Sequence, residues 1–463
     1  MLIGLFQTIC KPIFGSFERE EFKKFLRMGL IFALIIGSYW TLRVLKDSIF
    51  IDLVDKHQLP WAKTASLFCL LPLVMIYTKL FDKYSREKMF YILATTYGTL
   101  IAVFAILLAV TQGPAELIAN REGLAYVGTK VLGYLWYVFV ESYGSLVVVL
   151  FWSFASDITS PDSAKKGFSL VVAIGQLGGI VGPVLIGGLP KMMGFQTSAI
   201  SVVICSLSTL MIIVMMKYFL RVTPARLLAS FHGANEKSTE KEQEPGFLEG
   251  LRLILQHKYL MGIFSIIFIY EVIVTIFDYN FKYLAATHYT GTELTAYLGW
   301  YGSSVNFVAL ACLLLGVNNI TRVLGLGVAL AMMPVIVGMA LFGFITIDSL
   351  SFLFALMVGS KAINYALNGP AIKQLYIPTT HDVRYKSQAW IETFGSRGSK
   401  EAGSIFNMLL APLQRMYGII AGKSIYITLS GFLGFALVGV WFFIALFLGK
   451  THKKAIKENK VVC

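Results

Sequence analysis

The sequence is poor in charge: Asp, Glu, Lys and Arg make up 14% of its 463 residues, whereas they form about a quarter of an ordinary soluble domain. Apolar residues make up 56% of the chain, and its mean hydropathy is +0.70. So many apolar residues cannot all be buried inside a water-soluble core, which indicates that a lipid bilayer surrounds much of the chain. The composition therefore argues against a soluble enzyme.

The sequence also lacks the residue groupings on which disulfide frameworks, metal sites and hydrolases depend. Its five cysteines are widely scattered, and most of them lie inside apolar runs. No HExxH, paired CxxC or GxSxG motif occurs. The stretch GIIAGKS at 418–424 is one residue shorter than a phosphate-binding loop and predicts a turn between helices. We therefore expect no enzyme activity, no cofactor and no bound metal ion.

Apolar runs of about 20 residues, long enough to cross a bilayer, recur from one end of the chain to the other. We expect transmembrane spans at roughly 28–50, 63–81, 89–111, 130–156, 167–189, 197–220, 260–286, 293–315, 323–346, 350–368, 400–421 and 426–449. The sequence thus predicts an all-α membrane protein of about 12 transmembrane helices in two six-helix bundles, arranged as in major-facilitator transporters.

A charge-dense stretch, NEKSTEKEQEPG, separates the sixth span from the seventh and is typical of a polar linker. The expected parts are an N-terminal interfacial segment at 1–27, an N-terminal six-helix bundle at 28–222, a cytoplasmic linker at 223–246, a C-terminal six-helix bundle at 247–450 and a cytoplasmic tail at 451–463. Lys and Arg gather near both ends and in this linker, which predicts cytoplasmic termini. We attribute the formal net charge of +14 to topology and expect no nucleic acid as a partner.

The stretch SLVVAIGQLGGIVGPVLIGGLP in the expected fifth span carries six glycines. Small residues let neighbouring helix backbones approach closely, so this pattern favours a role in packing. A hinge that moves during transport is the alternative.

Charged side chains at helix depth are costly in a membrane and persist mainly where they line a cavity or have a partner. In the first span, SYWTLRVLKDS places Arg43 and Lys46 three residues apart, so that two cations project toward one side of a helix and suit a phosphate chain. The alternative is that both side chains snorkel to the membrane surface. Glu141 lies among apolar and small residues well inside the fourth span, and we predict a functional role for it.

The seventh span, in IYEVIVTIFDYNFK, places Glu271 and Asp278 seven residues apart and therefore on one helix face. Lys282 follows Asp278 by four residues and can pair with it. Glu271 is then the more isolated acid, suited to accept a proton or to bind a hydroxyl or amino group of a substrate. The alternative is a hydrogen-bonded acid that braces the bundle.

Further cations lie in the later spans: Lys361 in the tenth, and Arg397 and Lys400 at the start of the eleventh. Arg397 and Lys400 repeat the Arg-x-x-Lys spacing of the first span, and bases outnumber acids inside the spans. A cavity of net positive character, relieved by a few carboxylates, suits a polyanionic substrate.

Four stretches, SYWTLRVLKDS, ESYGSLVVVLFWSFASDIT, YEVIVTIFDYNFK and LYIPTTHDVRYKSQAWIETFGSRGSKEAGS, resemble in order and spacing the nucleotide transporter family of obligate intracellular bacteria and plastids, the ADP,ATP carrier proteins. The resemblance covers nearly the whole chain and implies that Lys46, Glu141 and Lys400 are important for transport. Where the better-known ATP/ADP exchangers carry Glu, this chain has Asp278, and Glu271 stands where they usually have Gly. The run SRGSKEAGS also departs from their pattern.

The resemblance implies a transporter that moves nucleoside tri- and diphosphates by alternating access, in the ATP/ADP exchange mode. The departures leave open a proton-coupled importer of other nucleotides, such as GTP, UTP or CTP, and a major-facilitator carrier of another anionic metabolite. The expected substrate-binding residues are Arg43, Lys46, Glu141, Glu271, Asp278, Lys282, Arg397 and Lys400.

The expected partners are the nucleotide substrates, the lipid bilayer and, in the proton-coupled mode, protons. We expect the carrier to work as a monomer. No long Ser-rich and Arg-rich stretch of the kind that directs import into plastids precedes the first span. We therefore expect a multi-pass protein of the bacterial inner (plasma) membrane.

Overall fold

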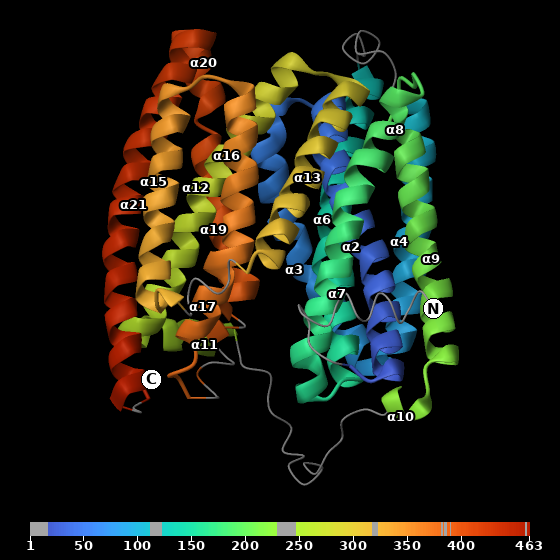
Figure 1. Ribbon diagram of the computed structural model, residues 1–463. Helices are drawn as coiled ribbons and strands as arrows, with labels where there is room; N and C mark the ends of the chain where they lie inside the picture. The colour runs from blue at the N-terminus through green and yellow to red at the C-terminus, as the bar shows by residue number, and fades with distance from the viewer. Residues whose placement is uncertain are drawn as a thin grey trace. The chain divides into compact units, whose positions relative to one another are not determined.

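The chain is helical in the computed structural model, which describes residues 17–111, 123–228, 247–316, 323–380, 383, 387–388, 390–458 and 461–463 (Figure 1). None of these described residues lies in a β-strand, and eleven of their helices are long and apolar enough to cross a membrane. Helices satisfy their backbone polar groups internally, which is what a chain in hydrocarbon requires. The predicted class, an all-α multi-pass membrane protein, is confirmed.

The packing divides the chain into two compact units. Unit 1 comprises Met1–Lys237 and Ala285–Leu310, and unit 2 comprises Ser238–Leu284 and Ala311–Cys463. Unit 1 contains α2 (Arg19–Leu53), η1 (Lys56–Gln58), α3 (Leu59–Lys83), α4 (Arg86–Thr111), α6 (Gly123–Asp157), α7 (Pro161–Val181), η2 (Gly182–Ile186), α8 (Gly187–Met192), α9 (Ala199–Val222), α10 (Ala225–Leu228) and most of α13 (Gly291–Leu314). Unit 2 contains α11 (Phe247–Gln256), most of α12 (Lys258–His288), α15 (Leu326–Thr346), α16 (Leu350–Ile363), η4 (Asn364–Asn368), α17 (Gly369–Leu375), η5 (Ile391–Gly395), α19 (Ser396–Asn407), α20 (Leu410–Tyr417) and α21 (Ile419–Glu458).

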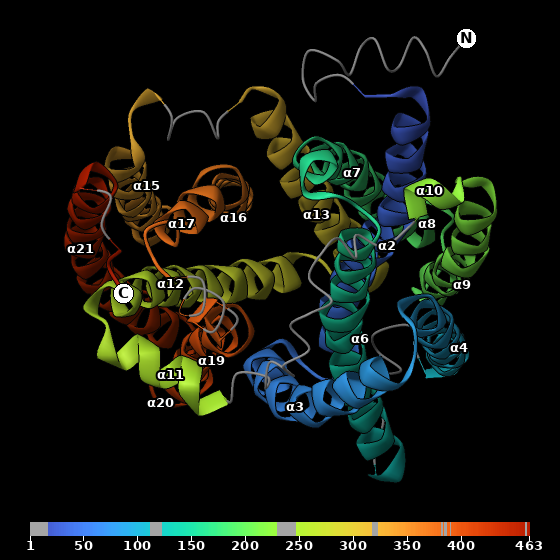
Figure 2. The ribbon, with the colours of Figure 1, turned by 90° about the horizontal axis from the view of Figure 1, so that it is seen from below.

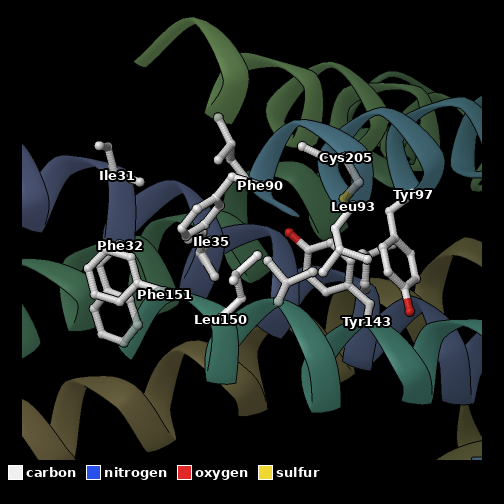
Figure 3. Packing of buried hydrophobic residues seen from close by; sticks show 14 of the residues in the cluster. Ile31, Phe32, Ile35, Phe90, Leu93, Tyr97, Tyr143, Leu150, Phe151 and Cys205 are labelled. Atoms are coloured by element: carbon white, nitrogen blue, oxygen red, sulfur yellow. The ribbon is translucent and has the colours of Figure 1, made fainter. Parts of the chain in front are cut away.

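Aromatic and aliphatic side chains from α2, α4, α6 and α9 form the core of unit 1 (Figure 3). Phe32 of α2 stacks on Phe151 of α6 with ring centroids 4.5 Å apart, and Tyr97 of α4 meets Tyr143 of α6 edge to face at 5.3 Å. The Tyr97 hydroxyl also exchanges a hydrogen bond of 2.7 Å with Ser142, so its polar end is satisfied inside the core. This packing fixes α2 and α6 against each other.

Glycines bring α7 close to α2, and the two helices lie side by side in both ribbon views (Figures 1 and 2). A Cβ added at Gly178 would lie 2.0 Å from the carbonyl oxygen of Ala33, and one at Gly182 would lie 2.7 Å from that of Gly37. These distances are shorter than any van der Waals contact, so only glycine fits there. Gly178 and Gly182 therefore serve helix packing, and these contacts provide no evidence for the hinge alternative.

The segment Gly291–Leu310 of α13 packs within unit 1, although it follows α12 in the chain. Its first backbone amide, of Gly291, donates to the Asp52 carboxylate at 3.1 Å. One turn later the Thr295 hydroxyl donates to Ser48 at 2.8 Å. The end of α2 is therefore joined to the start of α13 by polar contacts.

A buried polar network joins α12, α19 and α21 in unit 2. The Asn280 amide donates to the Tyr426 hydroxyl at 3.2 Å, and that hydroxyl donates to Asn407 at 2.6 Å. Gly403 of α19 allows a close approach to α12, because an added Cβ would lie 3.0 Å from the carbonyl oxygen of Val272. Helices α12 and α19 thus meet at a glycine, as α2 and α7 do in unit 1.

The expected span at 400–421 is the one that the structure corrects. Two short helices, α19 and α20, cover 396–417, and α21 then runs without a break from Ile419 to Glu458. Gly418 has φ 84°, a left-handed conformation that side chains rarely tolerate, and it ends α20. The predicted turn in GIIAGKS is therefore confined to Gly418, and the rest of that stretch is helical.

The predicted boundaries of the two six-helix bundles stay predictions. Within the interfacial segment predicted at 1–27, α2 already begins at Arg19 and continues into the first span. Residues 1–16 and the greater part of the predicted linker, 229–246, lie outside the described residues, as do 459–460 of the predicted tail.

Candidate substrate-binding residues

In unit 1, Lys46 of α2 is paired with Glu141 of α6. The Lys46 ammonium lies 2.5 Å from the Glu141 carboxylate, 3.9 Å from that of Asp47, and 4.2 Å from the ring centre of Tyr137. The Lys46 side chain is 7% exposed, whereas the Glu141 side chain is 42% exposed. A buried cation thus has one acid that solvent still reaches, together with an aromatic face that favours its charge.

Arg43 lies one turn before Lys46 on α2 and is partly buried. Its guanidinium group lies over the ring of Trp40, 5.0 Å from the centroid, and donates a long hydrogen bond of 3.4 Å to the Tyr39 hydroxyl. The aromatic neighbours hold the guanidinium group beside α2. The structure therefore joins Lys46 to Glu141, and Arg43 lies one turn away on the same helix.

In unit 2, Asp278 of α12 contacts two lysines through its two oxygens. Lys282 donates to one oxygen at 2.6 Å, as the four-residue spacing predicts, and Lys361 of α16 donates to the other at 3.2 Å. All three side chains are less than one tenth exposed. The low-polarity surroundings strengthen these charge-assisted hydrogen bonds.

A second group in unit 2 lies between α12 and α19. The Glu271 carboxylate is 3.8 Å from the Lys400 ammonium and accepts a hydrogen bond of 3.3 Å from the Ser396 hydroxyl. Lys400 is half exposed, and Arg397 lies one turn before it on α19 and is partly buried. Glu271 therefore has an ammonium and a hydroxyl as close neighbours, in contrast to the isolated acid that its position in the sequence suggests.

The sequence indicated Lys361 as an interior cation but did not place it among the expected substrate-binding residues. Its partner Asp278 lies 83 residues away in the chain, and only the packing of α16 against α12 shows the contact. The signal available in the sequence was a cation in the middle of an apolar span. The contact of Asp52 with Gly291 was not predicted for the same reason, because the two residues are 239 positions apart in the chain.

No group of three or more His, Cys, Asp or Glu side chains within the described part of the chain is arranged to hold a metal ion. The clusters described above combine carboxylates with ammonium groups, which can donate charge-assisted hydrogen bonds to an anion.

Comparison of the sequence with known families finds one match over nearly the whole chain. A family described as TLC ATP/ADP transporter matches residues 6–452. Among curated proteins, ADP,ATP carrier protein 1 of Rickettsia bellii is 24% identical, and that of Rickettsia prowazekii is 26% identical. Each of these comparisons covers 97% of this chain and 97% of the relative.

Solved structures with the same fold are transporters at low sequence identity. A bacterial homologue of the human lysosomal transporter Spinster, in an inward-facing and unoccupied conformation, has a TM-score of 0.60 at 12% identity, with 95% of this chain and 99% of that chain covered. A bacterial homologue of the iron transporter ferroportin, in an inward-facing state, gives a TM-score of 0.60 at 12% identity and covers 92% of this chain and 98% of that chain. These likenesses bear on the fold alone and confirm its predicted major-facilitator-like class.

Proposed function

Since the chain belongs to the TLC ATP/ADP transporter family, we propose that it exchanges ATP for ADP across a membrane by alternating access. The family and the curated relatives are carriers, so the chain is a transporter and not an enzyme. The named Rickettsia relatives are ADP,ATP carrier proteins, and their similarity to this chain extends over nearly their whole length. This similarity supports adenine nucleotides as the substrates.

The observation that carries this proposal is the pairing of buried lysines with carboxylates on neighbouring helices. Lys46 is held by Glu141 in unit 1, and Lys361 and Lys282 are held by Asp278 in unit 2. A carboxylate keeps a buried ammonium group compensated while no substrate is bound. A phosphate oxygen accepts the same charge-assisted hydrogen bonds, so nucleotide phosphates can take the place of the carboxylates.

We assign the remaining predicted residues by the same chemistry. Cations bind the phosphate chain, and carboxylates compensate those cations or contact the sugar and the base. The proposed phosphate-binding residues are Arg43, Lys46, Lys282, Arg397 and Lys400, and the proposed compensating acids are Glu141, Glu271 and Asp278.

Exchange is proposed in preference to proton-coupled import. The acid that favoured proton coupling in the sequence is Glu271, and its contacts with Lys400 and Ser396 suit a counter-ion within unit 2. We further propose that the carrier works as a monomer in a bacterial plasma membrane with both termini in the cytoplasm. The distribution of Lys and Arg and the bacterial source of the named relatives support this placement.

Competition for uptake of labelled ATP into proteoliposomes tests the proposed substrate. The purified chain is reconstituted with ADP inside, and unlabelled ATP, ADP, AMP, GTP, CTP, UTP, inorganic phosphate and citrate are added outside in turn. We expect ATP and ADP to compete most strongly, because they combine the polyphosphate chain with the adenine ring. Stronger competition by GTP, CTP or UTP would favour a carrier of other nucleotides, and competition by citrate or phosphate alone would favour a carrier of another anion.

A further inference from the structure

Lys361 shares a single carboxylate with a second lysine inside unit 2. Its ammonium group lies 3.2 Å from one oxygen of Asp278, while Lys282 lies 2.6 Å from the other oxygen. The three side chains are 9%, 9% and 7% exposed in the order Lys361, Asp278, Lys282, and together they have one more positive than negative formal charge. An anionic ligand that enters here can accept charge-assisted hydrogen bonds from two buried ammonium groups at once.

The helix that carries Lys361 has further polar features beside it. Two residues after Lys361 the α-helix gives way to the π-helix η4, a rare element that is frequent at functional sites. Within η4, Asn368 donates to Asn364 at 2.8 Å, but the carbonyl oxygen of the Asn368 side chain is buried and has no hydrogen-bond partner among the described residues. Buried polar groups of this kind are typical of a helix that lines a polar site rather than one that faces lipid only.

Lys361 also matches the arrangement of the first half of the chain. There the first helix, α2, is joined to the fourth, α6, by the pair of Lys46 and Glu141. In the second half the first helix, α12, is joined to the fourth, α16, by the pair of Asp278 and Lys361, with the charges exchanged. Glu141 and Lys361 both lie near the middle of their spans, Gly123–Asp157 and Leu350–Leu375.

We propose that Lys361 is a phosphate-binding residue that makes the carrier prefer nucleoside di- and triphosphates to monophosphates, with Asp278 as the carboxylate that it exchanges for phosphate oxygens. This inference rests on the proposed nucleotide transport. Displacing Asp278 releases two ammonium groups, those of Lys361 and Lys282, whereas displacing Glu141 releases one, that of Lys46. A chain of two or three phosphates spans both ammonium groups, while a single phosphate has fewer oxygens to offer.

The test compares Lys361→Gln, Lys361→Arg and a control, Lys373→Gln, in ATP uptake with ATP, ADP and AMP as competitors. Lys373 lies on α17 with an exposed side chain, so its substitution removes one cation without touching the Asp278 group. Lys361→Gln should weaken the apparent affinity for ATP and ADP by about tenfold or more and that for AMP by clearly less, since one charge-assisted contact is lost. Lys361→Arg should keep the preference for ATP over AMP, and Lys373→Gln should behave as the unmodified chain.

A purely structural role of Lys361 is separated by thermal unfolding in detergent. Lys361→Gln leaves Asp278 and Lys282 as a pair of one acid and one base, so without nucleotide its unfolding temperature should not fall, whereas the increase that ATP produces should shrink. A lower unfolding temperature together with an unchanged ATP-to-AMP preference would overturn the inference and make Lys361 a structural counter-ion. Unchanged affinities for all three nucleotides would overturn it as well.

The unmodified chain provides the arm that tests the proposed function itself. If it takes up ATP and Lys361→Gln loses no affinity, the role of Lys361 is refuted and nucleotide transport stands. If the unmodified chain takes up no nucleotide, both proposals are refuted.

Discussion

The charged clusters of the two units differ in how well their charges balance. In unit 1, Arg43 and Lys46 are accompanied by Asp47 and Glu141, two bases with two acids. In unit 2, the Asp278 carboxylate contacts two bases, Lys282 and Lys361, and the Glu271 carboxylate contacts Lys400. Unit 1 is therefore formally neutral at its cluster, whereas the Asp278 group of unit 2 has one more base than acid.

This difference separates two requirements of a carrier for polyanions. A compensated cluster holds its shape when empty and offers its cation only after a carboxylate has moved away. A cluster with surplus positive charge attracts the phosphate chain even before any carboxylate moves. Substitutions of these charged side chains test the difference between the two units.

Lys46→Ala should have the largest effect. It removes the buried Lys46 ammonium, the proposed phosphate ligand. We expect ATP uptake to fall about 100-fold, because a charge-assisted hydrogen bond to a charged partner is lost. Uptake into proteoliposomes measures this, and Lys217→Ala on the exposed side of α9 is the control. Near-normal uptake by Lys46→Ala in a folded protein would remove unit 1 from the proposed binding chemistry.

Asp278→Asn should lower stability more than Glu141→Gln does. The first change leaves Lys282 and Lys361 buried together without their carboxylate, at a cost of about 3 kcal/mol in the free energy of unfolding. The second change leaves Lys46 with Asp47 at 3.9 Å, and Glu141 is partly solvated, so about 1 kcal/mol is expected. Thermal unfolding of the two variants in the same detergent measures the difference, and the reverse order would contradict the assigned charge balance.

Lys400→Ala should reduce ATP uptake by about tenfold, less than Lys46→Ala. Its side chain is 54% exposed, and solvent weakens its contact with any phosphate. The apparent affinity should fall while the maximal rate changes little, as expected of a residue that attracts the phosphate chain. An exposed cation of the tail, Lys454, provides the control substitution.

Glu271→Gln should have the smallest effect on exchange. Its carboxylate lies 3.8 Å from a half-exposed ammonium group, a pair worth less than about 1 kcal/mol, so ATP uptake should stay within about threefold of normal. Uptake before and after the addition of a protonophore is the measurement. Loss of transport in Glu271→Gln together with protonophore sensitivity of the unmodified chain would support the proton-coupled alternative instead.

The sequence predicted local features of this structure better than distant ones. Apolar runs predicted eleven of the spans, because the length of a helix in a bilayer is set by the run itself. The pair of Asp278 and Lys282 followed from their four-residue spacing on one helix. Two other pairs join residues on different helices: Lys46 and Glu141 are 95 positions apart in the chain, and Lys361 and Asp278 are 83 apart. These pairs depend on how each helix is rotated about its axis.

The error at 400–421 has a local physical cause. The helix there is interrupted at residues 408–409, between α19 and α20, and it ends at Gly418, whose left-handed conformation separates α20 from α21. A glycine inside an apolar run is compatible with either a packed helix or a helix end, and the turn predicted in GIIAGKS is the helix end at Gly418. Gly175 and Gly178 of the fifth expected span show the other outcome, since there the helix continues and packs on α2.

Exchange of adenine nucleotides is tested most directly by the dependence of ATP uptake on internal ADP. Proteoliposomes containing the purified chain are prepared with ADP inside or with buffer alone, and the entry of labelled ATP is followed together with the exit of ADP. We predict that ATP enters only the ADP-loaded vesicles and that one ADP leaves for each ATP that enters. Equal entry of ATP into empty vesicles would contradict the exchange mechanism.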